Sequence, residues 1–182
     1  GLQVIDVSDP ASPLLVGSVD TAGSALSVAV SGSLAFVADY DRGLQVIDVS
    51  NPAAPWLRGS LDTPGFARGV SAAGSLVFVA DDYRGLQVID VSNPAAPTQR
   101  GVLKTPGSAW GVALSGSLAF VADYAFGLSV VDVSNPSLPR LLGFLDTEGT
   151  AVGVTVAGSL AFLADGAGGL PVIDVANPDT PC

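Results

Sequence analysis

The chain repeats itself every 42 residues, and this period limits the folds open to it. The segment GLQVIDVSNPAAP occupies residues 43–55 and occurs again, unchanged, at residues 85–97. Related segments begin at Gly1, Gly127 and Gly169, with no insertion or deletion between them. Such a period predicts one supersecondary unit, copied along the chain and stacked on itself. The sequence is therefore a single array of repeats at 1–42, 43–84, 85–126 and 127–168, with part of a fifth at 169–182.

Each repeat contains four segments with the composition of strands. Around the first repeat boundary they are residues 27–30, 34–39, 43–49 and 55–63, and the last is the most polar. The second and third are apolar at successive positions, so these strands need cover on both faces. The glycine of SGS at 31–33 and the prolines of NPAAP supply the turns between strands. The repeat thus predicts an antiparallel four-stranded sheet that is sandwiched between the sheets of its neighbours.

Four-stranded sheets of about 40 residues, stacked around an axis, form an all-β β-propeller. A β-solenoid is the alternative, although its coils are usually shorter and do not need four turns each. A helical repeat is excluded, because no segment has a sustained 3.6-residue apolar period and 22 Gly and 13 Pro interrupt the chain.

The small residues at 67–72 suit the innermost strand of a propeller blade, where space is shortest. With this phase, residues 1–23 supply the third and fourth strands of one blade, and three whole blades follow. Residues 150–182 then supply the first three strands of another. Because residues 1–7 and 169–175 would compete for one third-strand position, we expect an arc of about four blades from a larger ring. A closed four-bladed ring is the alternative.

The segments AWGVALSGSLAFVADY (109–124) and GLQVIDVSNPAAP, with the cores LQVID and LSVVD, resemble the LVIVD repeat. This family comprises bacterial and archaeal surface or secreted proteins. The resemblance covers essentially the whole chain and implies a propeller that lies at the cell surface or outside the cell. It implies no particular reaction, because the family has no common enzymatic activity.

Charge and composition exclude several classes of partner. Seventeen acidic and seven basic residues give a net charge of −10, which opposes binding to nucleic acid and to anionic lipid surfaces. The uncharged stretch 105–122 contains Pro106 and several Gly and Ser residues, so we expect no membrane insertion. The chain has no His and a single Cys, Cys182, which excludes a zinc cluster and an internal disulfide.

Variation among the repeats gathers on one face. Strands of a meander alternate in direction, so the loops from strand two to strand three share a face with the loops that lead into each first strand. On this face the repeats differ, and they carry aromatic residues and arginines: Tyr40, Arg42, Phe66, Arg68, Tyr83, Arg84, Trp110, Tyr124 and Phe126. Such residues anchor many interfaces. We therefore predict that this set, with Phe66, Arg68 and Trp110 near the axis, binds a protein or glycan partner; the alternative is that these positions vary because nothing constrains them.

Acidic residues recur at two positions of the repeat. Asp39, Asp81, Asp123 and Asp165 follow the second strand and would form a circle of carboxylates in a ring, which could bind calcium. The stronger interpretation is that each accepts hydrogen bonds from backbone N–H groups of the turn that follows it. The same interpretation applies to Asp6, Asp48, Asp90, Asp132 and Asp174. We therefore expect no cofactor, with calcium as the alternative.

The sequence favours binding over catalysis. Without His the chain has neither a common serine or cysteine triad nor a metal-hydrolase cluster. Paired carboxylates near a central channel could still hydrolyse glycosides, and such a hydrolase is the alternative function. The non-repeated acids Asp41, Asp82, Glu148 and Asp179 show no evident pairing. We expect a non-catalytic interaction scaffold, secreted or at the cell surface.

Overall fold

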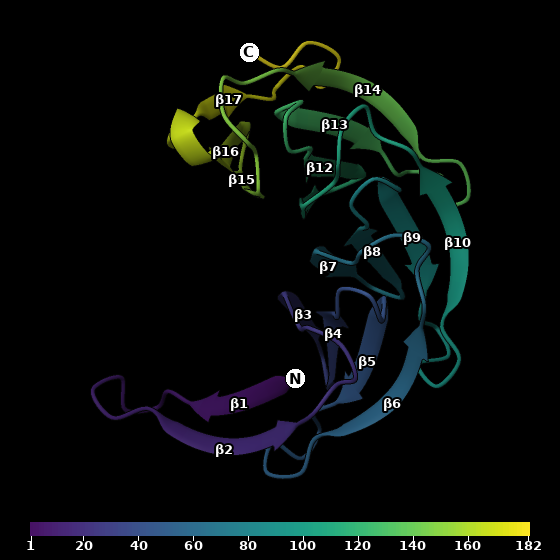
Figure 1. Cartoon of the computed structure of the whole chain (residues 1–182), viewed down its shortest axis with the longest axis vertical. Helices are drawn as coiled ribbons and strands as arrows, with labels where there is room; N and C mark the ends of the chain where they lie inside the picture. Colours follow the sequence, from purple (N-terminus) through teal and green to yellow (C-terminus); the bar gives the residue numbers. More distant parts are fainter.

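The computed structural model describes all of residues 1–182 and forms an open arc of antiparallel sheets (Figure 1). Seventeen strands and one short 3-10 turn, Gly166–Gly168, make up its regular structure. No helix in the chain has the length and apolar character that crossing a bilayer requires. The all-β prediction is confirmed.

Three sheets are complete four-stranded blades, and their strands are hydrogen-bonded in chain order. The first blade consists of β3 (Ser27–Ser31), β4 (Leu34–Ala38), β5 (Leu44–Asp48) and β6 (Trp56–Leu61). The second consists of β7 (Gly69–Ala73), β8 (Leu76–Ala80), β9 (Leu86–Asp90) and β10 (Thr98–Leu103), and the third of β11 (Gly111–Ser115), β12 (Leu118–Ala122), β13 (Leu128–Asp132) and β14 (Arg140–Leu145).

Two smaller sheets end the arc. The N-terminal sheet contains β1 (Leu2–Asp6) and β2 (Leu14–Val19), which correspond to the third and fourth strands of a blade. The C-terminal sheet contains β15 (Gly153–Ala157), β16 (Leu160–Ala164) and β17 (Val172–Asp174), which correspond to the first three strands. The predicted blade phase is therefore confirmed.

Tight hairpins join the first and second strands of each blade. In the second blade Ala73 pairs with Leu76, so Gly74 and Ser75 form a two-residue turn. Gly74 has φ of 60°, and the equivalent Gly32, Gly116 and Gly158 have φ of 58–60°. Two-residue hairpin turns need positive φ, which glycine adopts without steric cost. The turn chemistry predicted from SGS is confirmed.

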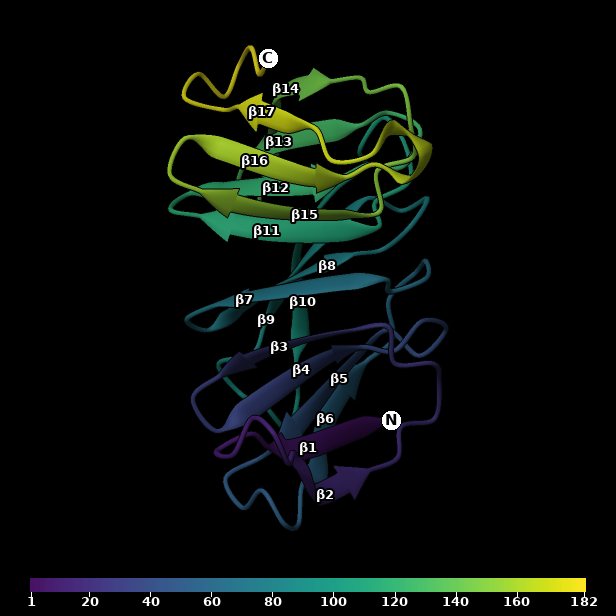
Figure 2. The ribbon, with the colours of Figure 1, turned by 90° about the vertical axis from the view of Figure 1, so that its left-hand side faces the viewer.

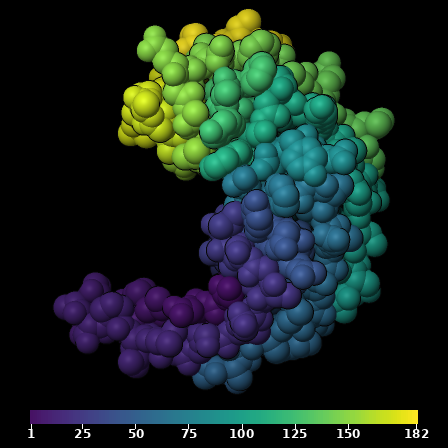
Figure 3. Space-filling view, in the orientation of Figure 1, coloured from purple at the N-terminus to yellow at the C-terminus, as the bar shows by residue number.

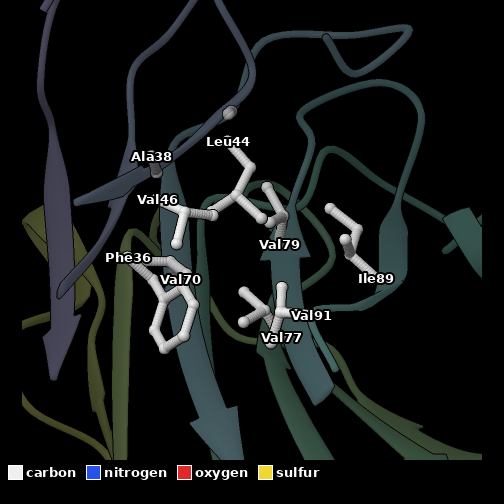
Figure 4. Packing of buried hydrophobic residues seen from close by; sticks show 10 residues of the cluster. Phe36, Ala38, Leu44, Val46, Val70, Val77, Val79, Ile89 and Val91 are labelled. Atoms are coloured by element: carbon white, nitrogen blue, oxygen red, sulfur yellow. The ribbon is translucent and has the colours of Figure 1, made fainter. Parts of the chain in front are cut away.

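The core lies between blades rather than within one sheet. Figure 4 shows Phe36, Leu44 and Val46 of the first blade facing Val79 and Ile89 of the second, and all five are at most 1% exposed. Similar buried clusters join the second blade to the third and the third to the C-terminal sheet. Strands that are apolar on both faces thus find cover on both sides, as predicted.

The first strands β3, β7, β11 and β15 line the inside of the arc, where Figure 2 shows them one above the other. Close approach favours glycine here: a Cβ on Gly69 would lie 2.6 Å from the Trp110 carbonyl oxygen, and one on Gly111 would lie 3.0 Å from the Gly153 Cα. The prediction of small residues near the axis is confirmed.

The arc does not close on itself. The two ends of the chain lie apart in the space-filling view, on either side of a wide gap (Figure 3). The radial arrangement of the sheets rules out a β-solenoid, and the gap rules out the closed four-bladed ring as the form that this chain adopts. Apolar side chains are exposed at the N-terminal end, including Ile5 (51%) and Val30 (66%).

Candidate binding face

The loops that carry the predicted partner-binding residues lie on one side of the arc. In Figure 2 the loops after β4, β8, β12 and β16 and the loops that lead into β7, β11 and β15 lie on the right, and the short hairpins lie on the left. We call the right-hand side the aromatic face and define it by the nine residues predicted above. The assignment of these nine residues to one side of the arc therefore holds.

Backbone bridges join neighbouring blades on the aromatic face. Tyr40 pairs with Ala67, and the two residues exchange hydrogen bonds of 3.0 and 2.9 Å. Asp82 pairs with Ala109 and Tyr124 with Ala151 in the same way. Each bridge places the side chain that follows a second strand beside the loop that leads into the next blade. Residues that are far apart in sequence therefore meet on this face.

The bridging residues have an unusual backbone conformation. Tyr40, Asp82 and Tyr124 have φ of 52–54°, in the left-handed region that residues with a Cβ rarely adopt. Gly166 stands at the equivalent position of the C-terminal sheet with φ of 54°. The fold requires this conformation in every repeat, and three of the four repeats meet the requirement with a residue that carries a large or charged side chain.

Aromatic rings stack across the first two blades. The Tyr40 and Phe66 rings are parallel, with centroids 4.5 Å apart, and Phe66 meets the Tyr83 ring edge to face at 6.0 Å. Further along the face the Trp110 ring stacks on Tyr124 at 4.9 Å. These distances lie in the range of favourable aromatic pairs.

Arg68 connects the two groups of rings. Its guanidinium carbon lies 3.9 Å from the centroid of the Trp110 ring and 5.4 Å from that of Tyr40, both within cation–π range. Its Nε atom donates a hydrogen bond of 2.7 Å to Oδ2 of Asp82. The side chains of Arg68 and Asp82 are only 21% and 13% exposed, so the pair is well shielded from water.

Asp82 is the residue that sequence reasoning missed. The sequence shows no evident partner for this acid, yet Asp82 stands at the repeat position that holds Tyr40 and Tyr124, and it pairs with Arg68. Two substitutions in the same stretch of sequence were the available signal: Asp82 replaces a tyrosine, and Arg68 is an arginine at a position where no other repeat has one. The cationic side chain and its carboxylate are 14 residues apart in sequence, and the bridge between blades brings them together.

Seven of the nine predicted residues form one connected set. Arg84 joins it through the Tyr83 ring, whose centroid is 5.2 Å from the guanidinium carbon. Arg42 and Phe126 lie outside the set; both are exposed, Phe126 to 42%. Tyr83 and Tyr124 are also well exposed, at 47% and 38%. The set thus has a shielded centre at Arg68 and aromatic side chains that reach solvent around it.

A hollow of about 240 Å³ runs along the inner strands beside this centre. Arg68, Trp110 and Val152 line it together with Gly69, Gly111 and Gly153. Of the three residues expected near the axis, Arg68 and Trp110 line this hollow, whereas Phe66 does not and packs between Tyr40 and Tyr83 instead.

The recurring acids after the second strands bind within their own repeats. Asp81 accepts a hydrogen bond of 2.6 Å from the Thr63 hydroxyl and one of 2.9 Å from the backbone N–H of Gly65. Asp39, Asp123 and Asp165 are held in the same way by the equivalent threonine and glycine, and all four carboxylates are at most 1% exposed. The prediction that the hydrogen-bond donors lie in the following turn is therefore wrong. The donors lie 16 and 18 residues earlier, in the loop that leads into the blade.

Burial has a strong electrostatic effect on Asp81. Removal from water raises the pKa of this carboxyl to about 6, and the nearby Asp82 carboxylate also raises it, whereas the hydrogen bonds from Thr63 and Gly65 act in the opposite direction. Asp81 is fully buried, so its proton is not presented to a molecule bound at the surface.

A model of the LVIVD repeat matches the chain from end to end, at residues 1–21, 22–63, 64–105, 106–147 and 148–182. The chain belongs to the LVIVD repeat family. Each matched LVIVD repeat from residue 22 onward begins in the loop before an inner strand, so one repeat corresponds to one sheet of the arc.

Two solved structures have a fold similar to that of this LVIVD-repeat chain. The computationally designed Ika4 protein is similar with a TM-score of 0.72 and 11% identity, over 86% of this chain and 94% of Ika4. The computationally designed Ika8 protein is similar with a TM-score of 0.66 and 12% identity, over 85% of this chain and 46% of Ika8. At this level of identity the likeness shows the fold alone. No protein with a curated description matches the chain.

The second recurring acid of the LVIVD repeat closes the turn after the third strand, as predicted. Asp48 accepts a hydrogen bond of 3.0 Å from the backbone N–H of Ser50, and Asp6, Asp90, Asp132 and Asp174 accept the equivalent bond. Hydrogen bonds from the Ser50 hydroxyl and backbone lower the pKa of Asp48. Nowhere in the chain do three or more acidic or Cys side chains gather in a way that could hold a metal ion.

Proposed function

We propose that the chain is a non-catalytic interaction scaffold, placed at a cell surface or outside the cell, whose aromatic face binds a protein or glycan partner. The observation that carries this proposal is the connected set of aromatic and arginine side chains that spans the three complete blades. The placement outside the cell rests on the resemblance to the LVIVD family.

Two physical features support binding. Tyr83, Tyr124 and Phe126 are 38–47% exposed, which leaves large apolar areas for a partner to cover. The rings and Arg68 hold one another in place, so little side-chain entropy would be lost on association. Interface hot spots are enriched in aromatic residues and arginine, the residue types that make up this face.

The test compares a variant of the aromatic face with a control on the opposite face. Tyr83→Ala combined with Phe126→Ala removes two exposed rings that do not have positive φ. Leu138→Ala removes a side chain that is 74% exposed in the turn between β13 and β14. The wild-type chain and both variants are probed on a glycan array and by cross-linking to surface and secreted proteins of the source cells.

We expect the face variant to lose at least about tenfold in affinity for the partner that the wild-type chain retains, and the Leu138→Ala variant to bind as the wild type does. Equal binding by all three forms would place the partner elsewhere on the arc. A wild-type chain that retains no glycan and no protein would contradict the proposal as a whole.

A further inference from the structure

A second hollow lies at the outer perimeter of the arc, on the side of the second blade that faces the first. Its volume is about 490 Å³, which is within the range of small-molecule sites. Tyr83 and Arg84 border it from the loop after β8, and Gln87 borders it from β9. Gln99, Val102 and Lys104 border it from β10 and the residue that follows β10, the strand that Figure 1 shows at the perimeter.

Two cationic side chains that form no direct ion pair border this hollow. The chain has three ion pairs, formed by Arg58, Arg68 and Arg140, and neither Arg84 nor Lys104 takes part in one. Only seven basic residues are present in a protein of net charge −10, and two of them border the same space. Like charges at one site repel each other unless an anion lies between them.

Amide groups form the inner wall of the hollow. Gln87 is 1% exposed, and its Nε2 donates a hydrogen bond of 3.3 Å to the backbone oxygen of Arg84. Its Oε1 accepts one of 2.9 Å from Nε2 of Gln99. The two side chains therefore hold each other and the Arg84 loop in place. Gln99 remains exposed, so its amide oxygen and second N–H can bind the hydroxyl groups of a ligand.

The other repeats lack this combination. At the positions of Tyr83, Gln99 and Lys104 the first blade has Asp41, Leu57 and Asp62. The third blade has Ala125, Leu141 and Asp146. Since these repeats form the same sheet without the three side chains, the fold does not require them. Tyr83, Gln99 and Lys104 occur together in one blade only, and Lys104 stands where the other blades have an aspartate. This combination points to a ligand.

We propose that the hollow binds an acidic saccharide, a sugar unit that carries a carboxylate. Arg84 and Lys104 bind the carboxylate, Gln99 binds neighbouring hydroxyl groups, and the half-exposed Tyr83 ring covers the apolar face of the sugar. This inference rests on the proposed binding role of the aromatic face in so far as Tyr83 and Arg84 belong to it, and it names a ligand class for that edge of the face.

The test is calorimetric titration of the whole chain with a galacturonic acid oligosaccharide, and with a galactose oligosaccharide of the same length as the neutral probe. We expect the acidic probe to bind at least about tenfold more tightly than the neutral one, and its affinity to fall with added salt. Equal affinities, or no binding of the acidic probe, would overturn the inference. Displacement by an equal concentration of inorganic phosphate would also overturn it, because the hollow would then bind any small anion.

Two variants take residues that other repeats carry at the same positions, so the fold tolerates them. Lys104→Asp should weaken binding of the acidic probe at least about tenfold, and Gln99→Leu at least about threefold. Arg140→Asp makes the same change of charge on another blade and should leave the affinity within about twofold. Unchanged binding by both hollow variants would show that the hollow is not the site.

The same variants separate this inference from the proposed function. Lys104 and Gln99 are not among the nine residues of the aromatic face, so Lys104→Asp should leave capture of a partner through Tyr124 and Phe126 intact. Loss of acidic saccharide binding with partner capture retained is the result expected of this variant. A wild-type chain that captures a partner and binds no acidic saccharide overturns the inference alone.

Discussion

Position 40 of the repeat carries both a backbone requirement and side chains of the candidate site. Tyr40, Asp82 and Tyr124 have positive φ there, and the bridge to the next blade holds them in this conformation. A residue with a Cβ at positive φ is strained, on the order of 1 to 2 kcal/mol. The strain is balanced by the bridge and by the stacked rings, so side-chain contacts and backbone conformation oppose each other at one residue.

Replacement of Tyr124 separates the cost of the backbone strain from the stabilisation by ring stacking. Tyr124→Ala and Tyr124→Gly both remove the stack on Trp110, but only glycine relieves the positive φ. We expect the glycine variant to have the higher free energy of unfolding, by about 1 kcal/mol, in urea titrations. Tyr83, which does not have positive φ, is the control: there the alanine variant should be at least as stable as the glycine variant. The same order at both positions would contradict the role of backbone strain.

Asp81 makes stability depend on pH in an unusual direction. Its folded-state pKa of about 6 lies above the ordinary value of 3.8, so the native chain holds this proton more tightly than the unfolded chain does. The stabilisation from Asp81 is therefore fully present below about pH 4 and is lost as the pH rises to about 6. The shift corresponds to about 3 kcal/mol at most.

The variant Asp81→Asn, which does not titrate, tests this. Its free energy of unfolding relative to the wild type should rise between pH 4 and pH 6 and then level off. Asp90→Asn is the control with the opposite sign. Hydrogen bonds from Ser92 lower the pKa of Asp90, so the wild type gains stability over this variant as the pH rises through the acid range. A flat difference for Asp81→Asn over the same range would show that its pKa is not raised.

Strands and turns follow from short-range patterns, and the sequence therefore predicts most of the fold. Apolar runs such as 34–38 and the glycines of the hairpins have the same meaning in any antiparallel sheet. The bulge in each outer strand has a weaker signal, the glycine at 17, 59, 101 and 143. Val46 pairs with Gly59 and Ile47 with Leu57, so Arg58 lies opposite no partner. The extra residue increases local twist, which depends on the packing of neighbouring sheets.

The elements of the candidate site were predictable only in part. Loop positions that vary among repeats indicated the aromatic face, because the alternation of strands fixes which loops share a side. The contacts of Arg68 and the donors to Asp81 could not be found in this way. Each joins a loop to another loop 14 to 18 residues away, and many loops offer a suitable N–H or carboxylate. The choice among them is made by the three-dimensional arrangement of the strands.

At the scale of the whole molecule, each sheet depends on the sheets beside it. The clusters that join the three complete blades and the C-terminal sheet contain nine or ten buried residues each. The cluster between the N-terminal sheet and the first blade contains three. In an array whose units contact only their neighbours, stability is the sum of such interfaces. The N-terminal sheet is therefore the least stabilised part of the arc.

Native-state hydrogen exchange tests this distribution. We expect the amides of β1 and β2 to exchange much faster than those of β8, β9, β12 and β13, because few buried contacts oppose their local opening. The C-terminal sheet is the internal control, since it also lies at an end of the arc but has a cluster of full size. Its β15 and β16 amides should be protected nearly as well as those of the third blade. If the sheets at both ends exchange equally fast, local opening is governed by position at an end of the arc. If β1 and β2 exchange as slowly as the middle blades, the array opens as one unit. The difference in buried contacts would then have no effect on local stability.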